Sequence, residues 1–418
     1  MLDVYVSKQL VGVLDQPNPH IYVFNYLPDA PSNLPISLLM PKRTESWISR
    51  DLHPVFQISL PEGALRELIL RKFGKRFDRF GDLELLAVVG ENMVGRIQVT
   101  PHGQPLSGLT PQESLSRLIQ EDTTNLVKHY LGERLHESGV SGGLVKFLAK
   151  SPSHHQDSRT TLALDDWIIK LNDDDHPHIV LLEYFGMMAA RAAGLTVPEV
   201  HLAQDRKHLL IKRFDSNTKG VHIGFEDMGA LLGLPARDKF TGSVERVIKT
   251  ISTFCQGEKK RQSFDHFFGQ YLLASTIRNG DAHLKNFGLL YEDTKTAELA
   301  PVYDMLSMSV YAPILANARD ADDGLAINFE GSKRWLTTQT IDTLSNQCLM
   351  TERRVKDWTS QIANALVETT DEVIRYLKKF PEDHFASTAR RMLELWAVGL
   401  DALDSKAAQR VRHLTSAL

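Results

Sequence analysis

The first hundred residues alternate hydrophobic and polar positions in short runs, which is the pattern of half-buried β-strands. The run MLDVYVSKQLVGVL (1–14) has this alternation, and LELLAVVGENMVGRIQV (83–99) contains two β-rich runs on either side of a turn. Between them, LPEGALRELILRKFG (60–74) has the pattern and flanking residues of a helix. These runs predict a small strand-rich N-terminal domain, which ends near residue 105 in a stretch rich in Pro, Gly and Ser.

The pattern then changes to strands mixed with helices, and after residue 215 it becomes mainly helical. A Gly-rich turn near residue 140 precedes the strand-like run DDWIIKLN (165–172) and the apolar helical run IVLLEYFGMMAARAAGL (179–195). A pair of strands follows, formed by VPEVHLA and HLLIKRFD. Strands with one helix followed by a helical half is the α+β order expected of a bilobal nucleotide-binding fold.

Composition and charge narrow the class of protein. Hydrophobic residues make up 42% and charged residues 24% of the 418 residues, which is ordinary for a folded globular chain. The formal net charge of −4 argues against binding of nucleic acid over the whole surface. No window approaches the roughly 20 apolar residues that span a bilayer. No signal peptide is recognisable at the start, so a cytoplasmic protein without membrane contact is expected.

Cysteine usage points the same way. Cys255 and Cys348 are far apart in sequence and lack CxxC spacing, so they do not form a zinc site by themselves. We expect both to be structural residues in a reducing compartment.

The most informative polar segment is NGDAHLKNFGLL (279–290). It follows the amphipathic run SFDHFFGQYLLASTIR (263–278), which predicts a helix with Ser263 as its N-cap. Gly280 is expected to break this helix and to start a polar loop.

The loop has the residue types that phosphoryl transfer requires. Asp281 and Asn286 are five residues apart, as are the Asp and Asn of the protein-kinase catalytic loop H-R-D-x-x-x-x-N. A carboxylate can accept the proton of the attacking hydroxyl, an amide oxygen can bind magnesium, and Lys285 can place a cation against the transferred phosphate. The alternative is an ordinary polar loop in which Asp and Asn cap the next element and Lys is solvated.

Two further positions have kinase-like chemistry. An apolar strand-like run in APVYDMLS (300–307) delivers Asp304 into a turn, where a second magnesium ligand is required; a helix N-cap is the alternative. Lys170 ends an apolar β-run, as does the lysine that pairs with nucleotide phosphates in kinases. Glu183 in the following helix either pairs with Lys170 or lies on the solvent edge of the helix.

The fourth signal is the Gly-rich turn SGVSGGLVK (138–146). Gly139, Gly142 and Gly143 would let backbone N–H groups approach phosphate oxygens, although a simple glycine turn is the alternative. The segment matches neither G-x-G-x-x-G nor the Walker pattern. The order of the four signals along the chain is nevertheless that of a kinase, and chance placement of all four is less probable than that of any one.

These residues resemble the HipA family of bacterial toxin-antitoxin kinases. NGDAHLKN followed by PVYDM is the most specific part, and LPEGALRE, the helix with the L-x-V-P strand, and IKRFDS extend the similarity nearly end to end. The resemblance implies a divergent bilobal protein-kinase-like α+β fold. It places a HipA-type N-terminal subdomain at 1–105, an N-lobe-like region with the Gly-rich loop at 106–215 and a helical C-lobe at 216–418.

The resemblance also implies residue roles. Asp281 would be the catalytic base, assisted by Lys285, while Asn286 and Asp304 would hold Mg²⁺. Residues 212–214 would form the hinge against adenine. The ATP-binding residues implied in this way are Val140, Ser141, Gly142, Gly143, Lys170, Lys212, Phe214 and His283.

Three positions depart from the family pattern. Gly139 stands where a regulatory serine occurs in some members, which leaves Ser141 as the main autophosphorylation candidate and Ser138 as a weaker one. Phosphorylation there would add negative charge beside the ATP phosphates and repel them. Leu144 replaces the usual Gln of the turn, and Lys212 replaces the Glu that is common in the hinge.

The function implied by the resemblance is that of the toxin of a type II toxin-antitoxin system. Such a protein is a Ser/Thr kinase that transfers the ATP γ-phosphate to a protein, and family targets are aminoacyl-tRNA synthetases. A helix-turn-helix antitoxin of the HipB type would be its partner and would make most contacts with operator DNA. The alternatives are a catalytically inactive antitoxin-binding or DNA-binding scaffold and a small-molecule kinase.

Overall fold

The computed structural model describes most of the chain, in two structural units that each combine separate segments. Unit 1 contains Met1–Asp173, Glu199–Lys239 and Gly288–Ala297; unit 2 contains Asp174–Pro198, Phe240–Phe287 and Glu298–Leu418. The described residues are 1–77, 79–107, 114–132, 146–152, 164–172, 174–217, 220–312, 324–416 and 418.

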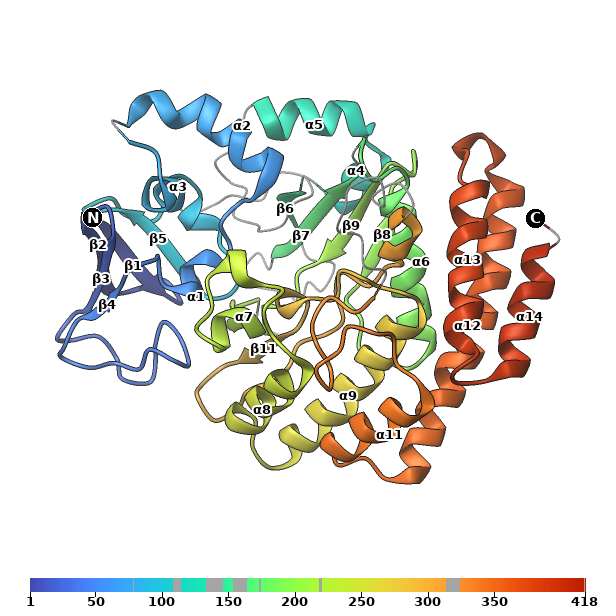
Figure 1. Cartoon of the computed structure of the whole chain (residues 1–418). Helices are drawn as coiled ribbons and strands as arrows, with labels where there is room; N and C mark the ends of the chain where they lie inside the picture. The colour runs from blue at the N-terminus through green and yellow to red at the C-terminus, as the bar shows by residue number, and fades with distance from the viewer. Residues whose placement is uncertain are drawn as a thin grey trace, which may run out of the picture. The chain divides into compact units, whose positions relative to one another are not determined.

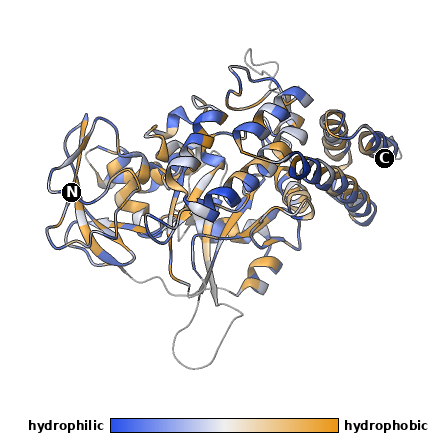
Figure 2. Ribbon diagram, turned by 90° about the horizontal axis from the view of Figure 1, so that it is seen from below, coloured by the Kyte–Doolittle hydropathy of each residue, from blue (hydrophilic) through white to orange (hydrophobic). Residues whose placement is uncertain are grey.

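Unit 1 begins with an antiparallel sheet of strand order β4-β3-β2-β1-β5 (Figure 1). Ser7 and Lys8 both have positive φ angles, 49° and 67°, so the β1–β2 hairpin closes through a tight turn of the kind that matches strand twist. Figure 2 shows hydrophobic residues along these strands, and Val4, Val6, Leu14 and Val99 are fully buried. The strands are β1 (Leu2–Val6), β2 (Gln9–Asn18), β3 (Ile21–Tyr26), β4 (Trp47–Ser49) and β5 (Ile97–Pro101).

Helices pack beside this sheet. The helix expected at 60–74 is confirmed as α2 (Gly63–Phe73), and α1 (Pro54–Gln57) precedes it. The strand expected at the start of 83–99 is wrong, because α3 (Asp82–Val89) occupies it. The Glu84 side chain accepts a hydrogen bond from the backbone N–H of Gly81 at 2.7 Å, which caps the helix start, and Leu and Ala are strong helix formers.

A second antiparallel sheet in unit 1 has the order β6-β7-β9-β8. It confirms the strand expected at 165–172 and the strand pair that follows. Helices α4 (Leu115–Gln120) and α5 (Thr123–Gly132) bury Leu118, Leu126 and Tyr130 in one core with Trp167 and Leu210 of the sheet. The strands are β6 (Lys146–Pro152), β7 (Leu164–Leu171), β8 (Val200–Leu202) and β9 (His208–Lys212).

A separate pair of strands in unit 1 joins segments that are far apart in sequence. β10 (Gly224–Asp227) pairs antiparallel with β11 (Gly288–Tyr291), and α7 (Met228–Leu231) follows β10. The fully buried Glu226 carboxylate accepts hydrogen bonds from the Ser37 hydroxyl at 2.6 Å, the Leu38 N–H at 2.7 Å and the Tyr291 hydroxyl at 2.6 Å. One carboxylate therefore ties this strand pair to the segment after β3.

Unit 2 is mainly helical. Within it α6 packs against α12, and α9 packs against α8, α11 and α13. In Figures 1 and 2 α12, α13 and α14 lie side by side, with the Trp358 and Trp396 side chains buried. Its helices are α6 (Ile179–Ala192), α8 (Val244–Phe254), α9 (Gly257–Thr276), α11 (Thr338–Gln347), α12 (Glu352–Lys379), α13 (Ala386–Leu400) and α14 (Ser405–Ser416), and β12 (Glu298–Leu299) is also part of this unit.

The predicted N-cap of α9 and the strand predicted after β12 are both wrong. Ser263 is not a helix cap, because α9 begins six residues earlier, at Gly257; the buried Ser263 hydroxyl instead accepts the Leu299 N–H at 2.9 Å. Residues 300–303, expected to be a strand, have no regular structure. Pro301 has no N–H to donate to a strand ladder.

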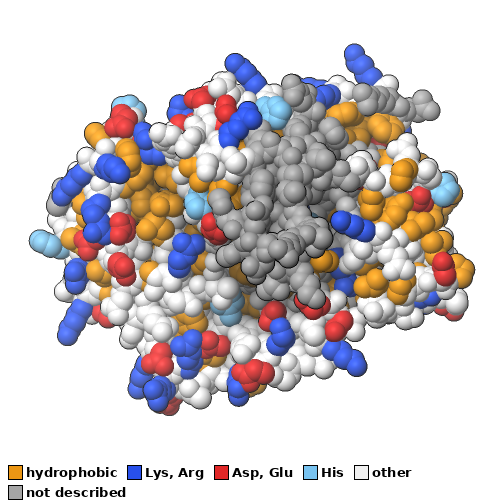
Figure 3. Space-filling view, turned by 180° about the vertical axis from the view of Figure 1, so that it is seen from behind, with side chains coloured by type: hydrophobic (Ala, Val, Ile, Leu, Met, Phe, Trp, Pro, Cys, Tyr) orange, Lys and Arg blue, Asp and Glu red, His pale blue; other side chains and the backbone are white. Residues whose placement is uncertain are grey.

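The states of the two cysteines and the distribution of charge on the surface can be compared with what the composition predicted. Both cysteines are free and buried, and burial raises the pKa of the Cys348 thiol to about 12 and also raises that of Cys255. On the face drawn in Figure 3, the described basic and acidic side chains are interspersed. Among the described residues, no helix is long and apolar enough to cross a bilayer.

Candidate functional site

The candidate catalytic loop starts where α9 ends in unit 2. The Asn279 N–H donates to the Ala274 carbonyl at 2.8 Å and the Arg278 N–H donates to the Ser275 carbonyl at 3.2 Å, the two bonds of a Schellman motif. Arg278 takes the left-handed position with φ 61°. The helix has therefore ended before Gly280, and the expectation that Gly280 breaks it is wrong. Arg is not the residue expected at such a position, so the sequence contains no signal for this ending.

The loop itself is held by its own backbone. The His283 N–H donates to the Asp281 carbonyl at 2.8 Å and to the Asn286 side-chain oxygen at 3.1 Å, and the Asn286 N–H returns a bond to the His283 carbonyl at 2.9 Å. The Asp281 side chain is 43% exposed, whereas that of His283 is 9% exposed and packs edge-on against Phe240. Asp281 is thus accessible to a substrate hydroxyl, and Asn286 is buried behind it.

The donors present fit magnesium bound together with a nucleotide. The Asn286 side-chain oxygen accepts one hydrogen bond, so a second lone pair can ligate a cation, and Asp304 supplies a carboxylate. No group of three or more His, Cys, Asp or Glu that could hold a metal occurs in the part of the chain that the structure describes. Magnesium does not require one, because it takes one or two carboxylates and completes its shell with phosphate oxygens and water.

Asp304 lies in a strained backbone segment of the same unit. Its φ is +53°, which is unfavourable for a residue with a side chain and must be imposed by its surroundings. The Asn279 side-chain amide donates to the Asp304 carbonyl at 3.0 Å. At the next residue, Gly186 of α6 faces the Met305 carbonyl so closely that an added Cβ would lie 2.0 Å from its oxygen. The alternative that Asp304 is a helix N-cap is wrong, because the next helix (Met308–Tyr311) is preceded by Ser307.

Helix α13 supports the chain beyond Asp304. The Trp396 indole N–H donates to the Ser307 hydroxyl at 2.7 Å, and the Arg391 Nε donates to the Val310 carbonyl at 2.9 Å. The Tyr303 hydroxyl donates to the Lys285 carbonyl at 2.9 Å and so links the two segments again. These supporting residues were not predicted. Only Gly186 had a signal, because a glycine inside an apolar helix indicates close approach of another backbone.

Gly186→Ala is expected to lower the free energy of unfolding by about 1–3 kcal/mol, because the new methyl group must displace the backbone at Met305. The displacement should also raise the Mg²⁺ concentration needed for half-maximal nucleotide binding. Urea unfolding and a magnesium titration measure the two effects. Gly81→Ala is the matched control, since its added Cβ meets only the end of the Glu84 side chain, at 3.3 Å. Equal behaviour of the two variants would contradict the prediction.

Lys170 lies on β7 of unit 1, and the structure adds a second lysine. Lys146 on β6 is its direct cross-strand partner, and the two residues are 8% and 5% exposed for Lys146 and Lys170 respectively. Two lysines that lie on the same face of neighbouring strands are residue types that can bind phosphate oxygens. Lys146 was not predicted as a site residue; its place at the end of the Gly-rich turn was the available signal.

Lys170→Met is expected to raise the KM for ATP about 10–100-fold, because it removes a buried cation from the phosphate site proposed below. Steady-state kinetics measure the KM, and urea unfolding checks that the variant is folded. The exposed Lys207 of the same unit offers a Lys→Met control. A folded Lys170→Met protein that keeps the wild-type KM for ATP would contradict the assignment.

Residues 212–214, predicted to contact adenine, lie at the end of β9 in unit 1. The Lys212 N–H donates to the Glu199 carbonyl and the Arg213 N–H donates to the Asp166 carbonyl, both at 2.8 Å. These two N–H groups are therefore engaged within the protein, and adenine recognition would fall to carbonyl oxygens and to Phe214. The Phe214 ring packs edge-on against Phe225, with 5.8 Å between the centroids.

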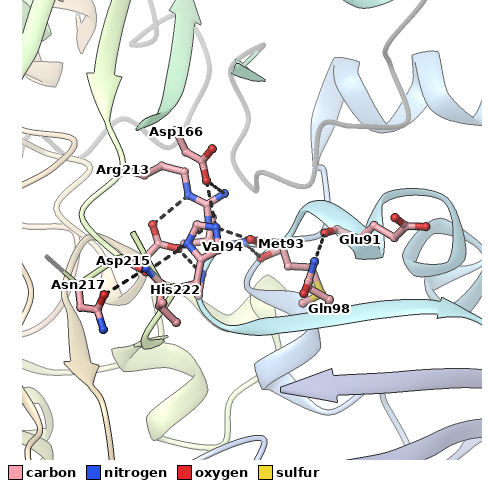
Figure 4. Close-up of polar contacts among 12 residues, drawn as sticks. Glu91, Met93, Val94, Gln98, Asp166, Arg213, Asp215, Asn217 and His222 are labelled. Carbon is pink, nitrogen blue, oxygen red and sulfur yellow. Dashed lines mark hydrogen bonds and ion pairs between the residues drawn. The ribbon is translucent and has the colours of Figure 1, made fainter. Parts of the chain in front are cut away.

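The residues next to this segment form a buried ion-pair network (Figure 4). The Arg213 guanidinium donates to both carboxylate oxygens of Asp215, with 2.9 Å between Nε and Oδ1, and to the Met93 carbonyl at 2.9 Å. The Gly95 N–H donates to Asp215 at 2.5 Å, and His222 lies 3.0 Å from Asp166. Burial opposes ionisation of Asp215, but the Arg213 charge outweighs it and holds the pKa of Asp215 below its ordinary value. The network joins the end of β9 to the segment before β5.

The remaining predicted positions divide into two groups. Glu183 is 3% exposed, so the alternative that it lies on the solvent edge of its helix is wrong; its pairing with Lys170 stays a prediction. The residues predicted in the Gly-rich turn lie outside the described residues: Ser138, Gly139, Val140, Ser141, Gly142 and Gly143.

Comparison with known proteins decides the family. A model of the HipA-like C-terminal domain matches residues 138–370, more than half of the chain, and a model of the HipA N-terminal domain matches residues 2–100. The chain belongs to the HipA family. The predicted family is thereby confirmed, and the two models together contain every predicted site residue.

Relatives of this HipA-family chain are named as kinases. "Putative kinase Y4dM" of Sinorhizobium fredii is 27% identical over 324 residues, 73% of each chain. "Putative kinase Y4mE" of the same organism is 27% identical over 330 residues, 74% of this chain and 78% of that protein.

A solved structure matches the whole chain. It is HipA of the Shewanella oneidensis MR-1 toxin-antitoxin system, solved with HipB and its operator DNA. The TM-score is 0.63 at 16% identity, and the match covers 100% of this chain and 95% of the other. At this identity the match shows a HipA fold with mixed helices and strands, and the bilobal kinase-like arrangement stays a prediction.

Proposed function

We propose that this HipA-family chain is a Ser/Thr protein kinase that transfers the γ-phosphate of ATP to a protein hydroxyl. The observation that supports it most is in unit 2, where the Asp281 loop and the strained Asp304 segment are hydrogen-bonded to the same side chain, that of Asn279. A base and a metal-binding carboxylate supported in this way are what in-line phosphoryl transfer requires.

Each residue has a defined task in this proposal. The exposed Asp281 carboxylate accepts the proton of the attacking hydroxyl, and Lys285 offsets negative charge on the transferred group. Asn286 and Asp304 would hold Mg²⁺, which neutralises charge on the phosphates when it is bound. Lys170, with Lys146 opposite, would bind phosphate oxygens, and Phe214 with the carbonyls of its segment would contact adenine. His283 stays a proposed ATP contact, and its backbone bonds to Asp281 and Asn286 also hold the loop.

The biological setting is proposed from the family. The matching Shewanella protein was solved with HipB and operator DNA, which supports a HipB-like helix-turn-helix antitoxin as the partner of this chain. Operator DNA would then be bound mainly through the antitoxin. An aminoacyl-tRNA synthetase is the proposed protein substrate, and Ser141, or less favourably Ser138, is the proposed site of autophosphorylation.

Intact-mass spectrometry tests the activity directly. Purified protein is incubated with ATP and Mg²⁺ alone and with a bacterial lysate, beside protein incubated with a non-hydrolysable ATP analogue. Phosphate gained by the chain at residues 138–141, or by lysate proteins, supports the proposal. Nucleotide binding without transfer in either mixture would favour the inactive scaffold, and transfer only to a small metabolite would favour a small-molecule kinase.

A further inference from the structure

Asn279 stands out among the buried polar residues of unit 2, because each of its polar groups is used in a different direction. Its side chain is 2% exposed. The side-chain oxygen accepts the Asp281 N–H at 3.3 Å and the side-chain amide donates to the Asp304 carbonyl at 3.0 Å. Its backbone N–H closes the Schellman motif at Ala274, and its carbonyl accepts the Ala282 N–H at 3.3 Å. The side chain is therefore held in one orientation.

The two side-chain hydrogen bonds restrain Asp281 and Asp304, the residues proposed as catalytic base and as metal ligand. One fixes the peptide from which the Asp281 side chain projects, and the other fixes the peptide plane that follows Asp304. Asp304 needs such a restraint, because its φ of +53° is unfavourable and would relax if its carbonyl were released. Gly186 leaves no room for the Met305 carbonyl to move toward α6, so Asn279 and α6 both restrain the segment.

We infer that Asn279 is a positioning residue that couples the catalytic base at Asp281 to the metal-binding carboxylate at Asp304. This inference rests on the proposed kinase function for its catalytic consequence, but the coupling itself is a property of the fold. The buried amide can be replaced neither by a pure acceptor nor by a pure donor, since its oxygen accepts one hydrogen bond and its NH₂ group donates the other. Loss of the hydrogen bond to the Asp304 carbonyl would let the Asp304 carboxylate turn away from the proposed metal position while Asp281 stays in place.

Two substitutions separate the effects of these two hydrogen bonds. Asn279→Asp has the same shape and keeps an oxygen for the Asp281 N–H, but it sets a second oxygen against the Asp304 carbonyl in place of the donor. The leucine of Asn279→Leu is similar in size to asparagine and makes neither hydrogen bond. Asn346→Asp, at an exposed position on α11 of the same unit, is the control for the added charge.

Amide hydrogen exchange, followed by mass spectrometry on the ligand-free full chain, measures the coupling without any need for activity. In Asn279→Asp, residues 302–309 should exchange about tenfold faster than in wild type while residues 281–286 stay protected. In Asn279→Leu both segments should exchange faster. Unchanged exchange at 302–309 in both variants overturns the inference, whether or not the wild type transfers phosphate.

The catalytic consequence is measured on wild type that transfers phosphate. In Asn279→Asp the Mg²⁺ concentration for half-maximal rate should rise about tenfold, and the rate should recover at saturating Mg²⁺. A variant that was merely unstable would lose rate equally at every Mg²⁺ concentration. An unchanged or lowered Mg²⁺ requirement overturns the positioning role. If the wild type transfers no phosphate at all, the proposed function fails, and the exchange result alone decides whether Asn279 couples the two segments.

Discussion

Asp281→Asn is expected to lower kcat for phosphoryl transfer about 10³-fold, because the amide cannot accept the proton of the attacking hydroxyl. The fold should be unaffected, with a free energy of unfolding within about 0.5 kcal/mol of wild type. The side chain is 43% exposed, and its ion pair with His283 Nε2 is long, at 3.9 Å. The substitution retains the hydrogen bonds of the Asp281 backbone N–H and carbonyl.

Steady-state kinetics with ATP and a Ser/Thr acceptor, beside urea unfolding, measure this effect. The KM for ATP should change little, because the base is not among the residues proposed to bind the nucleotide. Asp342→Asn, at an exposed position on α11 of the same unit, is the control and should keep full activity. A kcat that falls less than about tenfold would remove Asp281 from the role of base.

Asp215→Asn is expected to lower the free energy of unfolding by about 3–5 kcal/mol at pH 7, because it removes the carboxylate that both accepts from and neutralises the buried Arg213 guanidinium and leaves Asp166 at 3.8 Å as an ion-pair partner. The Arg213 and Asp215 side chains are 2% and 1% exposed, so water cannot replace the lost partner. Asp29→Asn changes an exposed carboxylate of the same unit and should cost less than about 0.5 kcal/mol. A cost below about 1 kcal/mol for Asp215→Asn would contradict the role of the pair.

The same pair predicts a dependence on pH. The pKa of Asp215 is lower in the folded protein than its ordinary value, so the unfolded chain binds more protons as the pH falls through the ordinary range near 4. The stability contributed by the ionised carboxylate is present above that range and is lost below it. The difference between wild type and Asp215→Asn should therefore be constant from pH 7 to about 5 and shrink below about pH 4. Urea unfolding across this range measures it.

A double replacement separates the buried charge from other effects. Arg213→Met combined with Asp215→Leu removes both charges and should be less destabilising than Asp215→Asn alone, since the buried guanidinium is removed with its carboxylate and Asp166 keeps His222 as a partner. The Met93 carbonyl and the Gly95 N–H would lose their partners, so full recovery is not expected.

Several elements were predictable because local sequence and tertiary packing agree. The period of α2 and α6, the apolar run of β7 and the β8–β9 pair each follow from residues adjacent in sequence. The prediction failed at α3, where an apolar run too short to show its period was assigned to a strand. It also failed at the start of α9, because the charged residues 258–261 interrupt the apolar periodicity over the first turns of that helix.

For the candidate site, the sequence by itself determined the reactive groups and their spacing: a carboxylate and an amide five residues apart in one loop, a second carboxylate after it, and a lysine at the end of a strand. It also determined the family, whose two domain models match the chain. These features depend on residue identity and on short distances along the chain.

Only the tertiary structure decided which residues hold those groups in place. Asn279, Gly186, Trp396 and Lys146 act on partners between 24 and 119 residues away, and nothing in their local sequence indicates those partners. The strained backbone at Asp304 likewise persists only because contacts with residues distant in sequence outweigh its cost. Chemistry was therefore readable from residue types, whereas its geometry depends on contacts that form only when distant segments pack together.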